Sequence, residues 1–186
     1  SIPLLLPLMI QIAYGESAVI SGWIVAPMAL TAMFGKSYVI KILDYFGYRK
    51  TLMTNTFIIG FLICCLGIPG INTNIYWFIP IISILGFFNS IQFTSMNTIA
   101  IADLRNSHTS SGNSLLAVNQ QIAIGFGIAF GLIVLKLFEN EPTLIQGNTH
   151  LAFRYTFFVV GFLTILSGFV FRRLHEKDGE NMKTEH

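Results

Sequence analysis

The run IYWFIPIISILGFFNSIQFTSMNTIAIA, residues 75–102, decides the fold class because it contains no charged side chain from end to end. A helix needs about 20 mostly apolar residues to cross the hydrocarbon core of a bilayer. A surface helix of a soluble protein would instead carry a charged face that recurs with a period of 3.6 residues. The run therefore predicts a transmembrane helix.

Further apolar segments flank this run on both sides, and the whole chain is 53% hydrophobic and only 11% charged. Soluble domains carry about a quarter charged residues. Residues 175–186 mix charges and lack large apolar groups apart from Met182, so we expect a mobile cytoplasmic tail there. The pattern predicts an all-α membrane protein, with a bundle over residues 1–174 whose six helices cover about 1–14, 17–43, 50–67, 75–102, 111–138 and 150–174.

The basic residues set the expected orientation. Placing the C-terminus in the cytoplasm leaves only Lys136 and Arg154, of 11 lysines and arginines, on the outer side. Cytoplasmic loops of membrane proteins carry an excess of Lys and Arg, which favours this orientation over its reverse.

The chain opens as Ser1-Ile2-Pro3, already inside an apolar stretch and without the charged region that precedes a signal peptide. The first apolar segment is also too short to span a bilayer alone. We expect a truncated first helix and a fragment of a longer protein.

Polar side chains within residues 75–102 are the first candidates for a binding site. Asn89, Gln92 and Met96 share one helical face, with Phe88 and Phe93 beside it. Amides combined with aromatic and thioether surface suit an amphipathic ligand. Alternatively, the amides hold neighbouring helices together by hydrogen bonds.

Two other helices carry glutamines that are cavity candidates. Gln11 shares a face with Pro3 and Pro7, and the prolines predict a bend in the first helix. Gln120 and Gln121 diverge by about 100° on a helix, so only one of them reaches a cavity comfortably.

Small residues follow in the same segment as Gln120. Gly127 and Gly131 lie four residues apart, which is typical of close helix packing in membranes. Lys36 is the one cation well inside a predicted span; it either extends to the interface or acts in gating or on substrate charge.

Several kinds of chemistry lack a motif. No Asp or Glu lies within a predicted span, so we expect any proton-coupling carboxylate elsewhere in the protein. No nucleotide-binding loop, nucleophile elbow or zinc-ligand spacing is present, so we expect neither an enzyme nor a metal or cofactor site. No basic patch with interleaved aromatics supports nucleic-acid binding.

Six helices, the polar faces and a charged loop between the second and third helices together resemble the C-terminal half of the major facilitator superfamily. Residues 43–50, LDYFGYRK, are similar to the loop signature of that family. Asp44, Gly47, Arg49 and Lys50 match it, and they imply a gating or cytoplasmic-loop role. Ile40 stands in place of a glycine of the signature, and Tyr45 in place of an arginine.

The segments 7–11, 21–30, 92–104 and 110–121 resemble more specifically the EmrB/QacA-type drug:proton antiporters with fourteen spans, in particular inner-membrane members of the HsrA- or MdtD-like kind. This resemblance implies two inverted three-helix repeats and alternating access. It implies proton-coupled export of small amphipathic compounds across the bacterial cytoplasmic membrane, together with an N-terminal half. The alternatives are a membrane scaffold or partner subunit that transports nothing, and an inactive relic of a split transporter gene.

Overall fold

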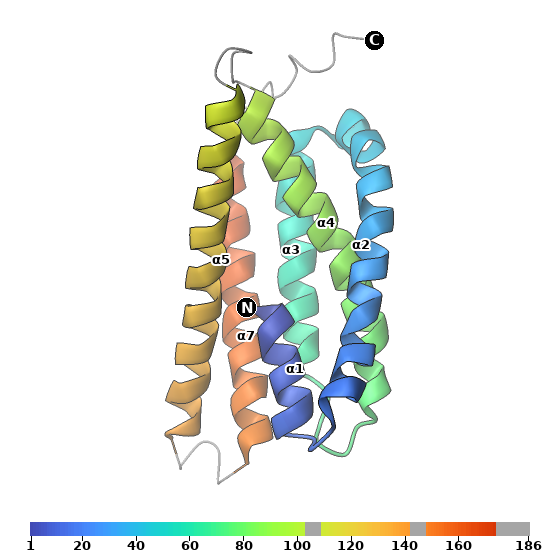
Figure 1. The fold of residues 1–186 in the computed structure, drawn as a ribbon, viewed down its shortest axis with the longest axis vertical. Coiled ribbons are helices and arrows are strands. Elements are labelled where there is room, and N and C mark those ends of the chain that lie inside the picture. Colours follow the sequence, from blue (N-terminus) through green and yellow to red (C-terminus); the bar gives the residue numbers. More distant parts are fainter. Residues whose placement is uncertain (103–108, 142–147, 174–186) are drawn as a thin grey trace.

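The structure, a computed structural model, describes residues 1–102, 109–141 and 148–173, and all the elements in these ranges are helices (Figure 1). The predicted tail, residues 175–186, lies outside them. The elements are α1 (Ile2–Ile12), α2 (Ala18–Phe46), α3 (Tyr48–Leu66), the 3-10 turn η1 (Ile75–Trp77), α4 (Phe78–Ala102), α5 (Thr109–Glu139), α7 (Thr149–Gly168) and the 3-10 turn η3 (Phe169–Arg173).

Five helical segments of the described chain are long and apolar enough to cross a bilayer. The remaining helix, α1, has 11 residues and is shorter than a span. The all-α membrane fold expected from the sequence is therefore present. The segments cover Ala18–Leu43, Tyr48–Leu66, Ile75–Ala100, Ser114–Glu139 and Thr149–Arg172.

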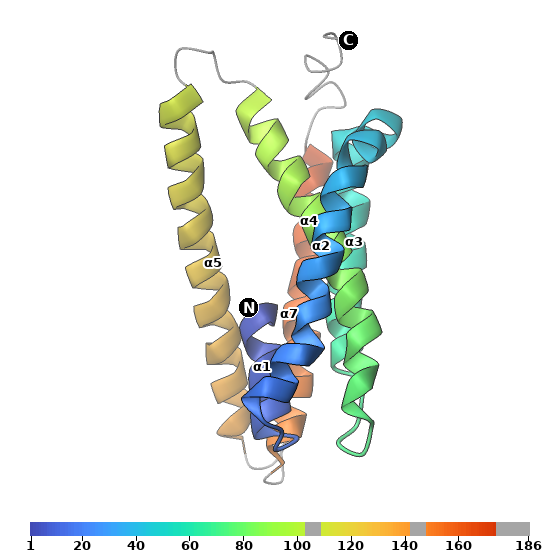
Figure 2. The ribbon, with the colours of Figure 1, turned by 45° about the vertical axis from the view of Figure 1, so that its right-hand side comes forward.

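The long helices run side by side as a bundle, and α1 packs among their lower ends (Figures 1 and 2). In α1, the side chains of Leu5, Leu6, Met9 and Ile10 are completely or almost completely buried. The most extensive helix pairs are α2 with α4 and α3 with α7. Figure 2 shows α5 at one side of the bundle, next to α1 and apart from α2.

Glycines allow the two main helix pairs to approach closely. A Cβ atom on Gly35 of α2 would lie 2.7 Å from the Phe87 carbonyl oxygen of α4, and one on Gly161 of α7 would lie 2.9 Å from the Gly60 oxygen of α3. Gly86 of α4 faces the Met28 carbonyl of α2 still more closely. Membrane helices associate through such backbone approach because lipid supplies little hydrophobic drive between them.

The predicted packing glycines of α5 face the short helix. A Cβ on Gly131 would lie 2.9 Å from the Ser1 Cβ and 3.0 Å from Leu5 Cδ1, whereas one on Gly127 would lie 4.0 Å from the nearest atom of Ser1. Gly131 is thus the tighter of the two positions.

The segment between the second and third helices is shorter than the sequence analysis expected. We expected helices ending near residue 43 and resuming at 50, but α2 continues to Phe46 and α3 starts at Tyr48. Gly47 alone separates them, with φ 75° and ψ 161°, a backbone conformation that is essentially restricted to glycine. The chain therefore reverses within one residue.

Candidate functional site

A polar cluster joins α3 to α4 halfway along the bundle. The Asn55 side chain donates from Nδ2 to Gln92 Oε1 (2.8 Å) and to the Phe88 carbonyl oxygen (2.8 Å). Gln92 in turn donates from Nε2 to Thr56 Oγ1 (2.9 Å), and it lies 3.9 Å from Met96 Sδ. Asn55 and Thr56 are both 4% exposed, so their polar atoms depend on these partners.

The sequence left two roles open for Gln92, ligand contact and interhelical hydrogen bonding. Both ends of its amide are used by α3, which favours the second role. We therefore interpret Gln92 primarily as a positioning residue that fixes the rotation of α4 about its own axis.

Three other residues of the predicted helical face on α4 are exposed. Asn89 is exposed, and Phe93 and Met96 are 49% and 45% exposed. On a regular helix Met96 and Phe93 lie within about 40° of Asn89, whereas Gln92 lies about 60° away on the side of α3. The predicted face of α4 thus divides into an edge, at Gln92, that bonds α3 and an exposed sector formed by Asn89, Phe93 and Met96.

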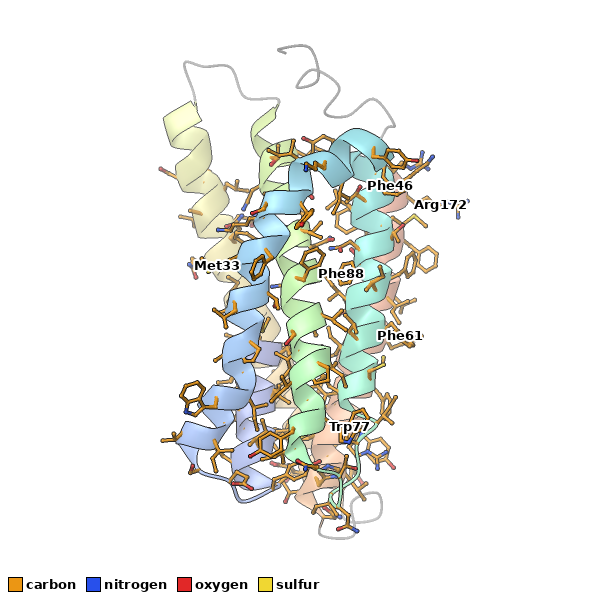
Figure 3. The ribbon with its side chains drawn as sticks, turned by 90° about the vertical axis from the view of Figure 1, so that its right-hand side faces the viewer. Met33, Phe46, Phe61, Trp77, Phe88 and Arg172 are labelled. Atoms are coloured by element: carbon orange, nitrogen blue, oxygen red, sulfur yellow. The ribbon has the colours of Figure 1, made fainter. Side chains whose placement is uncertain are left out.

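Phe88 belongs to the buried side of α4. Its ring is half-buried and meets the Phe87 ring edge-to-face, with 5.5 Å between the centroids. Figure 3 shows Phe88 between α2 and α3, and on a regular helix it lies about 100° from Asn89. The structure therefore does not bring Phe88 together with Asn89, Phe93 and Met96.

The two predicted glutamines outside α4 have different surroundings. Gln120 of α5 donates from Nε2 to Asn97 Oδ1 of α4, which links these helices. Asn97 lies about 80° around α4 from Asn89, opposite to the α3 edge. The exposed sector is consequently flanked by one polar contact to α3 and another to α5. Gln11 is exposed on α1.

The predicted gating residues gather where α2 meets α3. Gly47 forms the reversal, Arg49 is half-buried, and Lys50 is exposed in the first turn of α3. Asp44 lies near the end of α2, and its side chain is outside what the structure describes.

A second polar cluster, at the opposite end of the bundle, was not among the sequence candidates. The Tyr14 hydroxyl donates to the Gly70 carbonyl oxygen (3.1 Å) and lies 3.1 Å from His150 Nε2. Arg154 donates from Nε to the Gly67 oxygen (2.7 Å) and from Nη2 to the Ile68 oxygen (3.3 Å). These bonds tie α1 and α7 to the segment that follows α3.

Burial raises the pKa of the Tyr14 hydroxyl, and the nearby positive charge of Arg154 acts in the opposite direction. Arg154 satisfies carbonyls at the end of α3 that the helix itself leaves unpaired. A cation near a helix C-terminus is also favoured by the helix dipole.

Sequence reasoning also missed Asn55, although a signal was present. Asn55 stands within a predicted span and follows Thr51 and Thr54, and a buried amide in a membrane requires a partner. Which helix supplies that partner could not be read from one segment. For a metal, the described residues offer no group of three or more His, Cys, Asp or Glu side chains.

Comparisons with known proteins agree with this architecture. Two similar relatives carry provisional names: the transport protein HsrA of Haemophilus influenzae, 33% identical over 182 residues, and the multidrug resistance protein MdtD of Escherichia coli O1:K1, 32% identical over 183 residues. The alignments cover 98% and 97% of this chain but 39% of each relative, so the chain spans about two fifths of their length. No solved structure matches significantly.

The family profile described as Major Facilitator Superfamily matches residues 2–185, which is nearly the whole chain. Together with the helices long enough to span a bilayer, this makes the chain a multi-pass membrane protein. The chain belongs to the Major Facilitator Superfamily.

Proposed function

We propose that this bundle forms the C-terminal half of a transporter that exports small amphipathic molecules. The observation that carries the proposal is the exposed sector of α4, in which Asn89 shares one helical face with Phe93 and Met96. Such a surface offers hydrogen bonds and apolar contact to the same ligand. If only lipid surrounded the Asn89 amide, its placement in the membrane would cost free energy, because its polar atoms would lack hydrogen-bond partners.

The proposal assigns the opposite wall of the cavity to an N-terminal half, as in a transporter built from two bundles. Support comes from the relatives, whose names refer to transport and multidrug resistance and of which this chain covers 39%. Gln11 of α1 and the α5 helix would border the same cavity beside α4.

The proposed mechanism is alternating access, in which the two halves rock around a site near the middle of the bilayer. The Asn55–Gln92 bond would keep α4 in register with α3 during this motion. The segment with Asp44, Gly47, Arg49 and Lys50 would make contacts that differ between the two states, and the Gly47 reversal supports a stiff connection there.

We further propose proton coupling, with the coupling carboxylate outside the described spans, whose one acidic residue, Glu139, stands at a helix end. The basic residues favour a C-terminus on the cytoplasmic side of the bacterial inner membrane. Lys41, Arg49, Lys50 and Arg172 belong to helix ends that meet at one end of the bundle (Figures 1 and 3).

The test is efflux of a fluorescent amphipathic cation, such as ethidium, from cells that express the protein containing this bundle. Phe93→Ala should reduce efflux of ethidium severalfold while leaving protein abundance unchanged, because it removes ligand surface without disturbing the core. Phe61→Ala is the matched control, since Phe61 is 63% exposed on α3, away from the proposed cavity.

Equal efflux from both variants and the parent would contradict the binding assignment. Absence of any efflux by the parent for a broad set of amphipathic compounds would favour the scaffold alternative. Collapse of the proton gradient by an ionophore should abolish efflux if protons drive it.

A further inference from the structure

A pocket of about 260 Å³ lies between α2, α3 and α4, on the face of the bundle shown in Figure 3. Its walls are apolar: Ile42 and Phe46 of α2 stand across from Phe88 and Ile91 of α4. Its polar side is formed by the first turns of α3, where Lys50 is exposed and Thr51 is buried. The pocket is separate from the exposed sector with Asn89, Phe93 and Met96.

Thr51 carries an unusual polar atom for this environment. Its side chain is 6% exposed, and within the part of the chain that the structure describes its Oγ1 has no hydrogen-bond partner. A buried hydroxyl without a partner costs roughly 1–3 kcal/mol. Thr51 also lines the pocket, so a rotation of its side chain toward the cavity would offer this hydroxyl to a ligand there.

The charge at this end of the pocket favours an anion. Lys50, which lines the pocket, carries the positive charge of an ammonium group. The α3 dipole adds little here, because its positive end at Tyr48 lies next to the negative end of the α2 dipole at Phe46. An anionic group would therefore find a cation and a hydroxyl donor together.

The rest of the pocket favours an alkyl chain. Below the Lys50 end the lining is aliphatic and aromatic, and the volume is smaller than the 300 Å³ or more of sites for drug-sized molecules. Lys50 and Thr51 stand in the first turn of a segment that spans the bilayer, at the depth of lipid headgroups. The membrane supplies ligands with an anionic head and an alkyl chain at that depth.

We propose that this pocket binds one anionic phospholipid of the surrounding membrane, with its phosphate at Lys50 and Thr51 and one acyl chain between Ile42 and Ile91. The lipid would fill the space between α2 and α3 just below the Gly47 reversal. The lipid composition of the membrane would thus influence how the ends of α2 and α3 pack, independently of the proposed substrate site.

Native mass spectrometry of the full protein tests this proposal. The protein is placed in nanodiscs of equal parts phosphatidylglycerol and phosphatidylcholine, and the lipids that remain bound after release are counted. Both lipids carry the phosphate, but the choline ammonium cancels its charge in phosphatidylcholine. We therefore expect phosphatidylglycerol to be retained about fivefold or more over phosphatidylcholine, a ratio that corresponds to about 1 kcal/mol. Equal retention of the two lipids would overturn the proposal.

Variants separate the headgroup contacts from the chain contacts. Lys50→Gln should abolish most of the preference, because it removes the charge. Thr51→Val should lower retention of both lipids, since both carry the phosphate, and Ile42→Trp should do the same by filling the pocket. The matched controls are Lys41→Gln, an exposed lysine of α2, and Thr98→Val, whose hydroxyl donates to its own helix at the Thr94 oxygen (2.9 Å).

An unchanged preference in Lys50→Gln, unchanged lipid retention in Thr51→Val and Ile42→Trp, or the same losses in the controls, would refute the site. Competition with excess inorganic phosphate distinguishes a site for any anion from a site for a phospholipid. Phosphate that displaces phosphatidylglycerol completely would contradict binding of the acyl chain, whereas continued retention supports it. If the Lys50 or Thr51 variant does not fold, Ile42→Trp tests the site in its place, because it leaves both headgroup contacts intact.

Discussion

Asn55 of α3 and Gln92 of α4 are joined by a 2.8 Å hydrogen bond between Asn55 Nδ2 and Gln92 Oε1. Asn55 lies two turns into α3, and Gln92 lies midway along α4, so the bond sets how far α4 is rotated toward α3. This rotation turns Asn89, Phe93 and Met96 away from α3 and leaves them exposed. The polar contact therefore positions the proposed binding surface without belonging to it.

Replacing Gln92 with alanine should destabilise the bundle by about 1 kcal/mol, since hydrogen bonds between membrane helices are worth about that much. The substitution removes one of the two hydrogen-bond partners of the Asn55 amide nitrogen, and one of the two of the Thr56 hydroxyl. Thermal unfolding in detergent measures the loss of stability. Gln121→Ala, an exposed glutamine of α5, should leave the melting temperature unchanged. A Gln92→Ala protein as stable as Gln121→Ala, but with an altered substrate range, would restore direct ligand contact for Gln92.

Gly86→Ala should separate α2 from α4. The new Cβ would collide with the Met28 carbonyl and lie 2.7 Å from Thr31 Oγ1. Overpacking of this kind costs about 1–3 kcal/mol. Gly22→Ala is the control, because a Cβ there meets nothing within 4 Å and alanine is the better helix former. If both variants melt at the temperature of the parent, the close α2–α4 approach is wrong.

Gly47→Ala should cost about 1–3 kcal/mol because φ 75° with ψ 161° is strained for any residue with a Cβ. Gly70→Ala serves as its control, since its φ is not positive and the nearest atom to a new Cβ is 3.9 Å away. Thermal unfolding of the two variants decides between a strained reversal and an ordinary loop. Equal melting temperatures would indicate an ordinary loop.

The Tyr14 hydroxyl should make stability depend on alkaline pH. Its pKa is raised in the folded protein by burial, so the neutral form is favoured and its contribution is complete below the pKa of an unfolded tyrosine, about 10. The contribution is lost as the pH rises through the folded pKa. The melting temperature of the parent should therefore fall more steeply above pH 10 than that of Tyr14→Phe. Tyr76→Phe, at a 62% exposed tyrosine, should behave as the parent; parallel curves for all three proteins would argue against a buried Tyr14.

The helices themselves could be predicted because length and apolar composition determine a membrane span almost independently of its neighbours. The ends of the helices could be predicted less closely. The charged residues between 43 and 50 indicate a loop, but a single glycine in a conformation closed to other residues allows α2 and α3 to continue up to Gly47.

The candidate site could be predicted only in part, because helical spacing fixes which residues share a face but not which neighbour that face meets. Asn89 and Gln92 are about 60° apart, close enough to appear as one stripe. The position of Asn55 on another helix separates them into an exposed residue and a hydrogen-bonded one. For the same reason Gly86 gave no signal alone, since its importance depends on the Met28 carbonyl across the helix pair.

Accessibility of position 89 tests the central claim most directly. In the protein that contains this bundle, with Cys64 and Cys65 replaced by alanine, Asn89→Cys is treated with a hydrophilic maleimide in the presence and absence of a transported compound. We predict labelling of Asn89→Cys that the transported compound slows, and no labelling of Phe61→Cys, at an exposed position of α3 that we expect to face lipid. Failure of Asn89→Cys to react, as expected for a lipid-facing or buried position, would contradict a water-filled transport cavity along α4.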